Sequence, residues 1–373
     1  AGGLDLSARN DTAITFIGSD AAPDSVLMIN GDDVLTGGEK TGVVDVLNIT
    51  KAAILGGIKV DLSKADQVVS INGSANAAIQ TGFESVNVVN YTGFGAELIG
   101  NAEANTFTGS VKVDSISGGA GNDTINITNS TNSASDVMNG GAGTSDTMHI
   151  LATTDFANTD ANITNIEQIT MAAGGVDLDM TGQSEAFGYT GGTGANEITG
   201  SSGIDTIDAG DGADTLKGML GGDIMTGGTG ADVDTFTYTA NGQTASPAFG
   251  AAVTTTVGMD IITIVADTDE DLINVAAVIG VTLADEFDAV VALKNSGNIT
   301  ASHVVAGQNG VGDGKMAQYK GAYSSSADTF TVNNVGTDTL LMYANDGGAA
   351  GNEAVVLVGV TGIDSISNGV VTV

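Results

Sequence analysis

The stretch Gly191–Phe236 reads GGTGANEIT, GSSGIDTID, AGDGADTLK, GMLGGDIMT, GGTGADVDTF and divides into five consecutive short units. The first four are nonapeptides in one register, and the fifth carries an extra residue before its apolar position. Position 6 of the units is occupied by Asn196, Asp205, Asp214, Asp223 and Asp232. Position 8 is apolar and holds Ile198, Ile207, Leu216 and Met225, with Phe236 displaced. Glycine allows backbone angles that other residues avoid, and an apolar side chain between polar ones suits a short strand, so each unit predicts a tight anionic loop followed by a strand.

A second array begins at Gly100 and reads GNAEANTFT, GSVKVDSIS, GGAGNDTIN, with Asn105, Asp114 and Asp123 at position 6. A larger repeat surrounds the arrays, because DDVLTGGEKTGVVDVLNIT from Asp32 is similar to SDVMNGGAGTSDTMHIL from Ser135. The second of these blocks adds Asp136 and Asp146 to the candidate side chains. We expect each copy of the larger repeat to add coils to one continuous solenoid; two β-domains joined by the arrays are the alternative.

The spacing of the nonapeptides predicts where the carboxylates meet. Two nonapeptides complete one coil, and successive coils stack at about 4.8 Å, so residues two nonapeptides apart lie above one another. The predicted stacked pairs are Asn196/Asp214, Asp205/Asp223, Asp214/Asp232 and Asn105/Asp123, whereas Asp114 needs a partner outside this register. Carboxylate and carbonyl oxygens from two such loops can supply the six to eight ligands that Ca²⁺ prefers, while Mg²⁺ suits so flexible a cage poorly.

These units resemble the G-G-x-G-x-D-x-U-x signature of the RTX family, the calcium-binding β-roll repeats of secreted bacterial proteins. The resemblance implies several bound Ca²⁺ ions. The candidate metal residues are the loop glycines Gly118, Gly191 and Gly227 and the side chains of Asn105, Asp114, Asp123, Asp136, Asp146, Asn196, Asp205, Asp214, Asp223 and Asp232. Ala209 replaces glycine at position 1 of its unit and is not counted as a ligand. The neutral Asn105 and Asn196 predict weaker calcium binding at their loops.

The composition limits the partners. The 373 residues carry 45 acidic and 10 basic side chains, a net charge of −35, which argues against nucleic acid and anionic lipid and favours cations. Hydrophobic residues make up 42% of the chain, enough for a core, and cysteine is absent, which excludes disulfides and thiolate metal sites. No apolar run is long enough to cross a bilayer, so membrane insertion is not expected.

The chain is predicted to have three regions. Residues 1–98 form a β-rich solenoid with degenerate repeats, 99–240 hold the arrays with a β-rich insert at 127–190, and 241–373 form a β-rich C-terminal region. In the last region, TLADEFDAVVALKN from Thr282 has the spacing of a minor helix. The end of the chain resembles the segment that follows RTX repeats in proteins exported by type I secretion, and we expect the chain to be the C-terminal part of its parent.

The sequence offers little evidence for catalytic motifs or for other kinds of metal site. The motifs H-E-x-x-H and G-x-S-x-G are absent, and no catalytic group is expected. His149 alternates with apolar residues and is predicted to lie on a strand face and not to bind a metal. Asp267–Asp271 resembles the start of an EF-hand loop but lacks its glycine and terminal glutamate, so a solvated acidic turn is predicted.

The sequence thus predicts an all-β protein, a parallel β-solenoid or β-roll with calcium loops and a minor C-terminal helix. The low aromatic content and the missing catalytic groups favour a structural role. The repeats and the interleaved inserts resemble those of calcium-dependent bacterial surface-layer proteins, which are secreted to the cell surface and self-associate into a two-dimensional lattice. Cell-surface polysaccharide is a further candidate partner. The alternative is an RTX module of a secreted adhesin, or the carrier region of a type I-secreted hydrolase.

Overall fold

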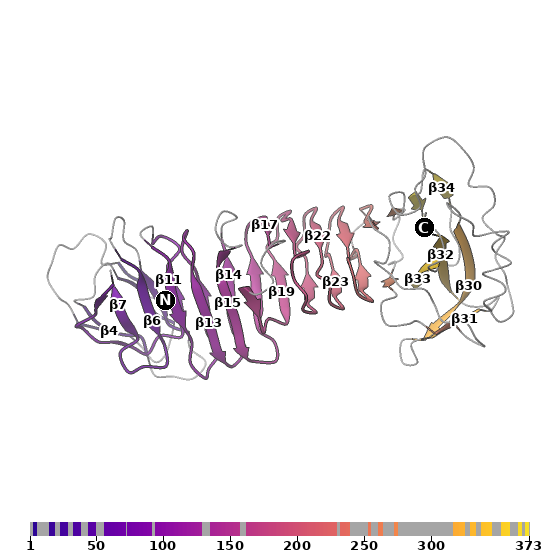
Figure 1. Cartoon of the computed structure of the whole chain (residues 1–373). Helices are drawn as coiled ribbons and strands as arrows, with labels where there is room; N and C mark the ends of the chain where they lie inside the picture. Colours follow the sequence, from indigo (N-terminus) through magenta and orange to yellow (C-terminus); the bar gives the residue numbers. More distant parts are fainter. Residues whose placement is uncertain are drawn as a thin grey trace. The chain divides into compact units, whose positions relative to one another are not determined.

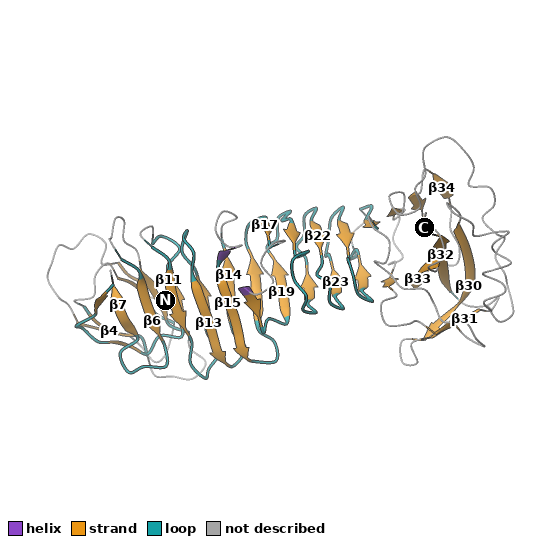
Figure 2. Cartoon of the chain, in the orientation of Figure 1, coloured by secondary structure: helices purple, strands orange, loops and turns teal. Residues whose placement is uncertain are grey.

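The computed structural model describes residues 3–5, 15–18, 23–28, 33–38, 44–49, 56–71, 73–91, 94–128, 135–156, 162–229, 232–238, 253–254, 260–263, 272–274, 316–324, 329–332, 337–344, 352–358, 365–367 and 370–372. The chain divides into two compact units, Ala1–Ala172 and Ala173–Val373 (Figure 1). Strands and loops make up almost all of the described residues (Figure 2), and none of the described helical segments is long and apolar enough to span a bilayer.

The first unit is built from parallel strands that wind into coils. Its largest sheet consists, in spatial order, of β1 (Gly3–Asp5), β3 (Ser25–Met28), β5 (Val46–Ile49), β10 (Ser85–Asn87), β12 (Thr106–Thr108), β14 (Thr124–Ile127), β16 (Thr147–Ile150) and β19 (Gln168–Met171). A second sheet contains the parallel strands β6 (Ile58–Asp61), β11 (Ala96–Ile99), β13 (Ser115–Ala120), β15 (Val137–Ala142) and β18 (Ile163–Thr164), with β7 (Val68–Ile71) and β8 (Ser74–Ala75) added antiparallel. The small strands β2 (Thr15–Ile17), β4 (Val34–Thr36) and β9 (Gln80–Thr81) form a third sheet, and β17 (Thr154–Asp155) completes the unit.

The second unit starts with the same coiled pattern and ends differently. One parallel series is β21 (Gly188–Thr190), β23 (Thr206–Asp208), β25 (Ile224–Thr226), β28 (Asp260–Thr263) and β33 (Asn352–Val358). The other is β20 (Leu178–Asp179), β22 (Glu197–Thr199), β24 (Thr215–Lys217), β26 (Thr235–Thr237) and β29 (Leu272–Asn274). Antiparallel pairing joins the remaining strands, which are β27 (Val253–Thr254), β30 (Met316–Ser324), β31 (Thr329–Val332), β32 (Asp338–Ala344), β34 (Ser365–Ser367) and β35 (Val370–Thr372).

The core consists of columns of apolar side chains stacked from coil to coil. Strands such as β12, β14 and β23 alternate buried residues with more exposed ones, since successive side chains point to opposite faces. In the first unit one column, continuous in strand pairing, is Val26, Leu47, Val86, Phe107, Ile125, Met148 and Ile169. In the second unit the position-8 residues Ile198, Leu216 and Phe236 stack on one side, and Ile207 and Met225 on the other. The apolar period read from the sequence therefore builds the core.

The predicted all-β parallel solenoid is confirmed. The fifth unit of the main array carries two extra residues, not one, because Phe236 pairs with Leu216. The division expected between residues 98 and 99 falls inside β11, where pairing with β6 and β13 continues. The helix predicted from Thr282 lies outside the described residues, and the continuity of the solenoid through both units stays a prediction.

A pair of isoleucines tests the core. Ile207 is 1% exposed and stacks in the core column, whereas Ile204, three residues earlier, is 51% exposed. In saturating calcium, we expect Ile207→Ala to lower the free energy of unfolding by about 2–5 kcal/mol, because it leaves a cavity between coils. Ile204→Ala should change it by less than about 0.5 kcal/mol. Urea unfolding followed by circular dichroism measures both, and equal losses would contradict the assigned core.

Candidate metal centres

A ladder of hydrogen bonds joins the acidic loop of each coil to the next. In the second unit the backbone N–H of Asp205 donates to Asp223 Oδ1 over 2.9 Å, and the N–H of Asp223 donates to Asp260 Oδ1 over 2.9 Å. On the other edge the N–H of Asp214 donates to Asp234 Oδ1 at 2.9 Å. Each carboxylate thus satisfies the N–H group that precedes the strand of the preceding coil.

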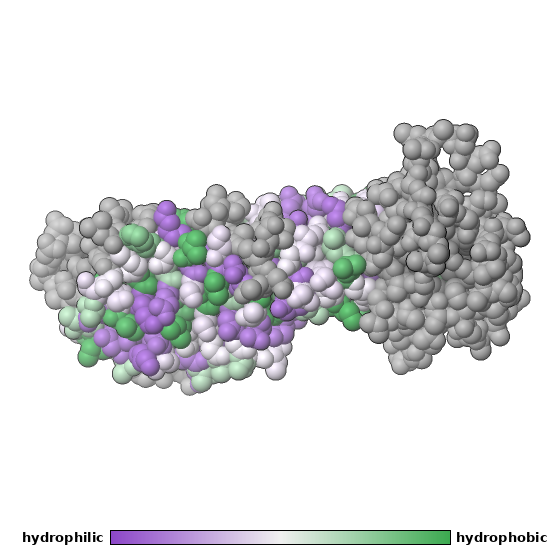
Figure 3. Space-filling view, viewed as in Figure 1, coloured by the Kyte–Doolittle hydropathy of each residue, from purple (hydrophilic) through white to green (hydrophobic). Residues whose placement is uncertain are grey.

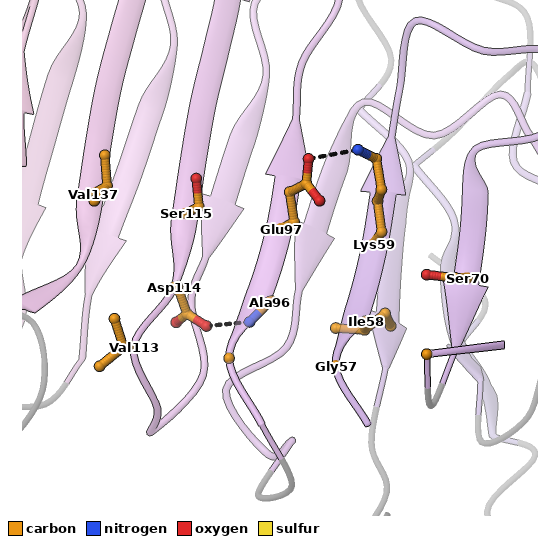
Figure 4. Close-up of a pocket in the computed structure, with 12 residues that line it drawn as sticks. Gly57, Ile58, Lys59, Ser70, Ala96, Glu97, Val113, Asp114, Ser115 and Val137 are labelled. Carbon is orange, nitrogen blue, oxygen red and sulfur yellow. Dashed lines mark hydrogen bonds and ion pairs between the residues drawn. The ribbon is translucent and has the colours of Figure 1, made fainter. Parts of the chain in front are cut away.

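The first unit contains the same ladder on two edges. Its donor and acceptor pairs are Asp24 N–H to Asp45, Asp45 N–H to Glu84, Asn105 N–H to Asp123, Asp123 N–H to Asp146, Asp146 N–H to Glu167, Ala96 N–H to Asp114 and Asp114 N–H to Asp136. All of these bonds are 2.6–2.8 Å long. Figure 4 shows the bond between Ala96, the first residue of β11, and Asp114, which directly precedes β13. The same bond therefore recurs on both edges of the coils.

Three of the four predicted pairs are neighbours in the ladder, and one is wrong. The N–H of Asn196 donates to Asp214 Oδ1 at 2.7 Å, and the Asp205/Asp223 and Asn105/Asp123 pairs follow the same rule. Asp232 is exposed, and Asp234 takes the place beside Asp214, because the two extra residues shift the carboxylate as well as Phe236.

The candidates from the larger repeat also join the ladder. Asp114, which lacked a partner in the nonapeptide register, meets Asp136, and Asp123 meets Asp146. These spacings of 22 and 23 residues include the segment between β14 and β15, so the nonapeptide period alone does not reveal them.

The sequence interpretation missed two glutamates. Glu84 and Glu167 each precede a parallel strand and accept the N–H of Asp45 and Asp146, both at 2.8 Å. The signal was present in the similar blocks GFESVNVVN and NIEQITMAA, in which glutamate stands before alternating apolar residues. Their longer side chain makes the same bond through Oε2.

Several ladder carboxylates are buried with one oxygen that has no hydrogen-bond partner. Asp123, Asp146, Asp214 and Asp223 are each at most 1% exposed. Their Oδ1 atoms accept a backbone N–H, whereas their Oδ2 atoms are buried without a hydrogen-bond partner. A buried carboxylate oxygen without a partner is costly, and a hard cation is the group that would compensate it. These residues therefore fit Ca²⁺.

The loop glycines bring the backbone against these carboxylates. A Cβ added at Gly118, Gly218 or Gly227 would lie closer than 3.0 Å to Oδ2 of Asp123, Asp223 or Asp234, respectively. At Gly191 an added Cβ would instead collide with the carbonyl of Ala209 in the next coil. Among the described residues no three His, Cys, Asp or Glu side chains converge, so an ion here would draw most of its ligands from backbone carbonyls.

Burial disfavours the charged form of these groups. It raises the pKa of Asp123, Asp205 and Asp214 to about 6, although backbone hydrogen bonds lower it in part. Burial likewise raises the pKa of Asp136 and Asp223 to about 7, with a neighbouring carboxylate acting in the same direction. The metal-free ladder is thus an electrostatically unfavourable arrangement that a cation would relieve.

The family comparison agrees with this geometry. The family described as the RTX calcium-binding nonapeptide repeat matches four copies, at residues 99–126, 190–225 and 199–233. The chain carries RTX calcium-binding nonapeptide repeats. RTX repeats bind Ca²⁺ at multiple sites, so calcium is the cofactor. No curated protein matches the chain. The match leaves out Asp136 and Asp146, which the structure adds to the same ladder.

The remaining candidates lie apart from the ladder. His149 stands on the outward face of β16, where its Nδ1 is 3.2 Å from Thr170 Oγ1, so its predicted place on a strand face is confirmed. Asp267–Asp271 lies outside the described residues.

A glycine pair tests the contact between loop and carboxylate. A Cβ at position 218 would collide with Oδ2 of Asp223, whereas a Cβ at Gly174 would meet nothing within 4 Å. We expect Gly218→Ala to destabilise the calcium-loaded protein by about 1–3 kcal/mol and to weaken its calcium binding, because the loop must shift. Gly174→Ala should leave both unchanged. Urea unfolding and calcium titration measure the difference, and equal behaviour of the two variants would contradict it.

The pKa shifts predict how the metal-free protein responds to pH. The folded carboxyls hold protons up to about pH 6 or 7, whereas the ordinary pKa is 3.8, so the folded state binds more protons. The contribution of these carboxyls to stability is therefore fully present below about pH 4 and is lost as pH rises to about 7. We expect the β-structure that forms in chelator at pH 5.5 to decrease as pH rises to 8, and saturating calcium to reduce this loss, both followed by circular dichroism. More β-structure in chelator at pH 8 than at pH 5.5 would refute the prediction.

Proposed function

We propose that this chain is the calcium-binding part of a bacterial surface-layer protein that is secreted unfolded and forms a two-dimensional lattice outside the cell. The carboxylate ladder carries the proposal. In the second unit the ladder links successive coils. It runs from Asn196 to Asp234 on one edge and from Phe187 to Asp260 on the other. A stack of coils braced in this way by buried anions depends on cations for its rigidity, which suits a structural element.

The outward face of the first unit supports lateral packing. Thr106, Thr124 and Thr147 form one row across β12, β14 and β16. Asn126 in the neighbouring row donates to Thr108 Oγ1 at 3.0 Å. Short polar side chains on parallel strands make a flat surface that a second copy can approach closely. Figure 3 shows hydrophilic and hydrophobic residues interspersed on the coloured surface, as an extended contact of mixed character requires.

Charge supports secretion before folding. In a calcium-poor cytosol the loop carboxylates repel one another, and an open chain is the form that can be exported. Extracellular modules of this kind bind calcium at about 10⁻⁴ to 10⁻³ M, and binding free energy then becomes folding free energy. RTX repeats also suggest a secreted protein. In this proposal the role is structural and not catalytic, and cell-surface polysaccharide is the candidate anchor.

A recess in the first unit favours the second candidate, an adhesin module. It has a volume of about 470 Å³ and is lined by residues that include Lys59, Glu97, Val113 and Val137 (Figure 4). Lys59 Nζ and Glu97 Oε1 are 2.5 Å apart across neighbouring strands. None of the described residues that line this recess is aromatic, so this part of the chain offers no stacking platform of the kind that sugar ligands commonly use.

A calcium titration of the chain tests the proposal. We expect β-structure to appear cooperatively in circular dichroism as calcium rises to the millimolar range, and ordered sheets to appear in negative-stain microscopy of the same sample. Magnesium at equal concentration is the control and should produce neither. Folding to a protein that stays monomeric in sedimentation would reject the lattice and favour the adhesin or the hydrolase carrier.

A further inference from the structure

The ladder carboxylates fall into two groups that the repeat signature does not distinguish. At Asp205, the N–H of Ser201 donates to Oδ2 at 2.8 Å, and the Ser201 hydroxyl lies 3.1 Å from the same oxygen. At Asp114, the N–H of Ser110 donates to Oδ2 at 2.6 Å, and the Ser110 hydroxyl donates to Oδ1 at 2.8 Å. The other group has no hydrogen bond to Oδ2 and consists of Asp123, Asp146, Asp214 and Asp223.

Neither burial nor the first glycine of the loop explains the difference. Asp114 and Asp205 are 2% and 0% exposed, as deeply buried as the other group. A Cβ at Gly109 or Gly200 would lie 2.6 Å from the Oδ2 atom of its own loop, a clash of the kind also found in the loop of Asp223. The cause must lie elsewhere in the loop.

The backbone at loop position 2 separates the two groups. In the loops of Asp123, Asp214 and Asp223, position 2 is Gly119, Gly210 or Met219, with φ between +78° and +108°. The loop of Asp146 is one residue longer, and the equivalent residue is Gly141, which pairs with Gly119 and has φ +112°. Among the described residues only Asn165 and Met219 are non-glycine residues with positive φ, so Ser110 and Ser201 have the ordinary conformation. In that conformation the N–H of position 2 reaches the carboxylate, as the two serine loops show.

Met219 indicates that the left-handed conformation belongs to the loop and is not a by-product of glycine. A bulky residue at φ +78° is unfavourable, and such strain persists only where the surrounding structure maintains it. Its loop nevertheless keeps Asp223 Oδ2 buried and without a hydrogen-bond partner. The strain therefore accompanies an oxygen that is left open for a ligand.

We propose that the residue at loop position 2 decides whether a loop takes up calcium. A left-handed residue leaves Oδ2 open for the ion, so Ca²⁺ binds at Asp123, Asp146, Asp214 and Asp223. Ser110 and Ser201 place an N–H and a hydroxyl where the ion would lie, and their loops are closed without metal. The site at Asp146 lies outside the matched RTX repeats, whereas the two closed loops lie inside them. This inference rests on calcium binding by the chain and not on lattice formation.

The decisive variant is Ser201→Gly in the whole chain. Glycine restores the left-handed option, so we expect one additional calcium ion per chain by equilibrium dialysis with atomic absorption. The control is Ser202→Gly, which removes the neighbouring hydroxyl, 3.2 Å from the Gln183 carbonyl, and should leave the ion count unchanged. An unchanged ion count in folded Ser201→Gly would overturn the proposal.

The reverse variants decide the matter if Ser201→Gly does not fold. In Met219→Ser, the serine can donate its N–H and hydroxyl to Asp223, as Ser201 does to Asp205, so this variant should lose one calcium ion. Met219→Gly should keep every ion and raise stability, because glycine adopts the left-handed conformation without strain. Retention of every ion by folded Met219→Ser would overturn the proposal. Ions are counted per chain, whether or not the chains assemble, so a failed lattice leaves this result unaffected.

Discussion

The hydrogen bond from a backbone N–H of one coil to the carboxylate of the next is the interaction on which the solenoid depends. The residue before each short strand has an N–H that the parallel sheet does not use, and buried backbone donors must find partners. The carboxylate supplies the partner and joins the coils at their edges, where the apolar columns of Ile, Leu, Met and Phe do not reach. Each repeat unit therefore supplies both the apolar side chain that stacks in the core and the carboxylate that bonds to the neighbouring coil.

That arrangement buries negative charge at every coil, which couples folding to cations. Asp146 and Asp223 are 0% exposed, and each keeps one carboxylate oxygen without a hydrogen bond. In a chain with net charge −35 the surrounding field adds to the local penalty. A divalent ion compensates both, so the ladder that orders the coils is also the feature that makes order conditional on calcium.

The sequence predicted the fold well because its information is periodic. The apolar residue at position 8 and the carboxylate at position 6 recur at fixed spacing, and the core column Ile198, Leu216 and Phe236 follows from them. Where the period breaks, the prediction failed. The partner of Asp214 is Asp234 and not Asp232, and Asp114 meets Asp136, 22 residues later, which is a longer spacing than two nonapeptides. Glu167 was missed because its side chain differs in length from the expected aspartate, although its place before the strand is the same.

Each serine-closed loop stands directly before an open loop along the chain, and this order has a consequence for folding. The serine-closed loop of Asp114 is followed nine residues later by the open loop of Asp123, and that of Asp205 by the open loop of Asp214. In a solenoid each coil is stabilised mainly by its neighbours, so a coil that closes without metal lowers the cost of ordering the next one. Coils whose loops are closed by serine would then order first, and calcium binding would order the coils next to them. The neutral Asn105 fits this view, because the N–H of Asn101 donates to its side-chain oxygen at 2.8 Å and closes a third loop without a charge.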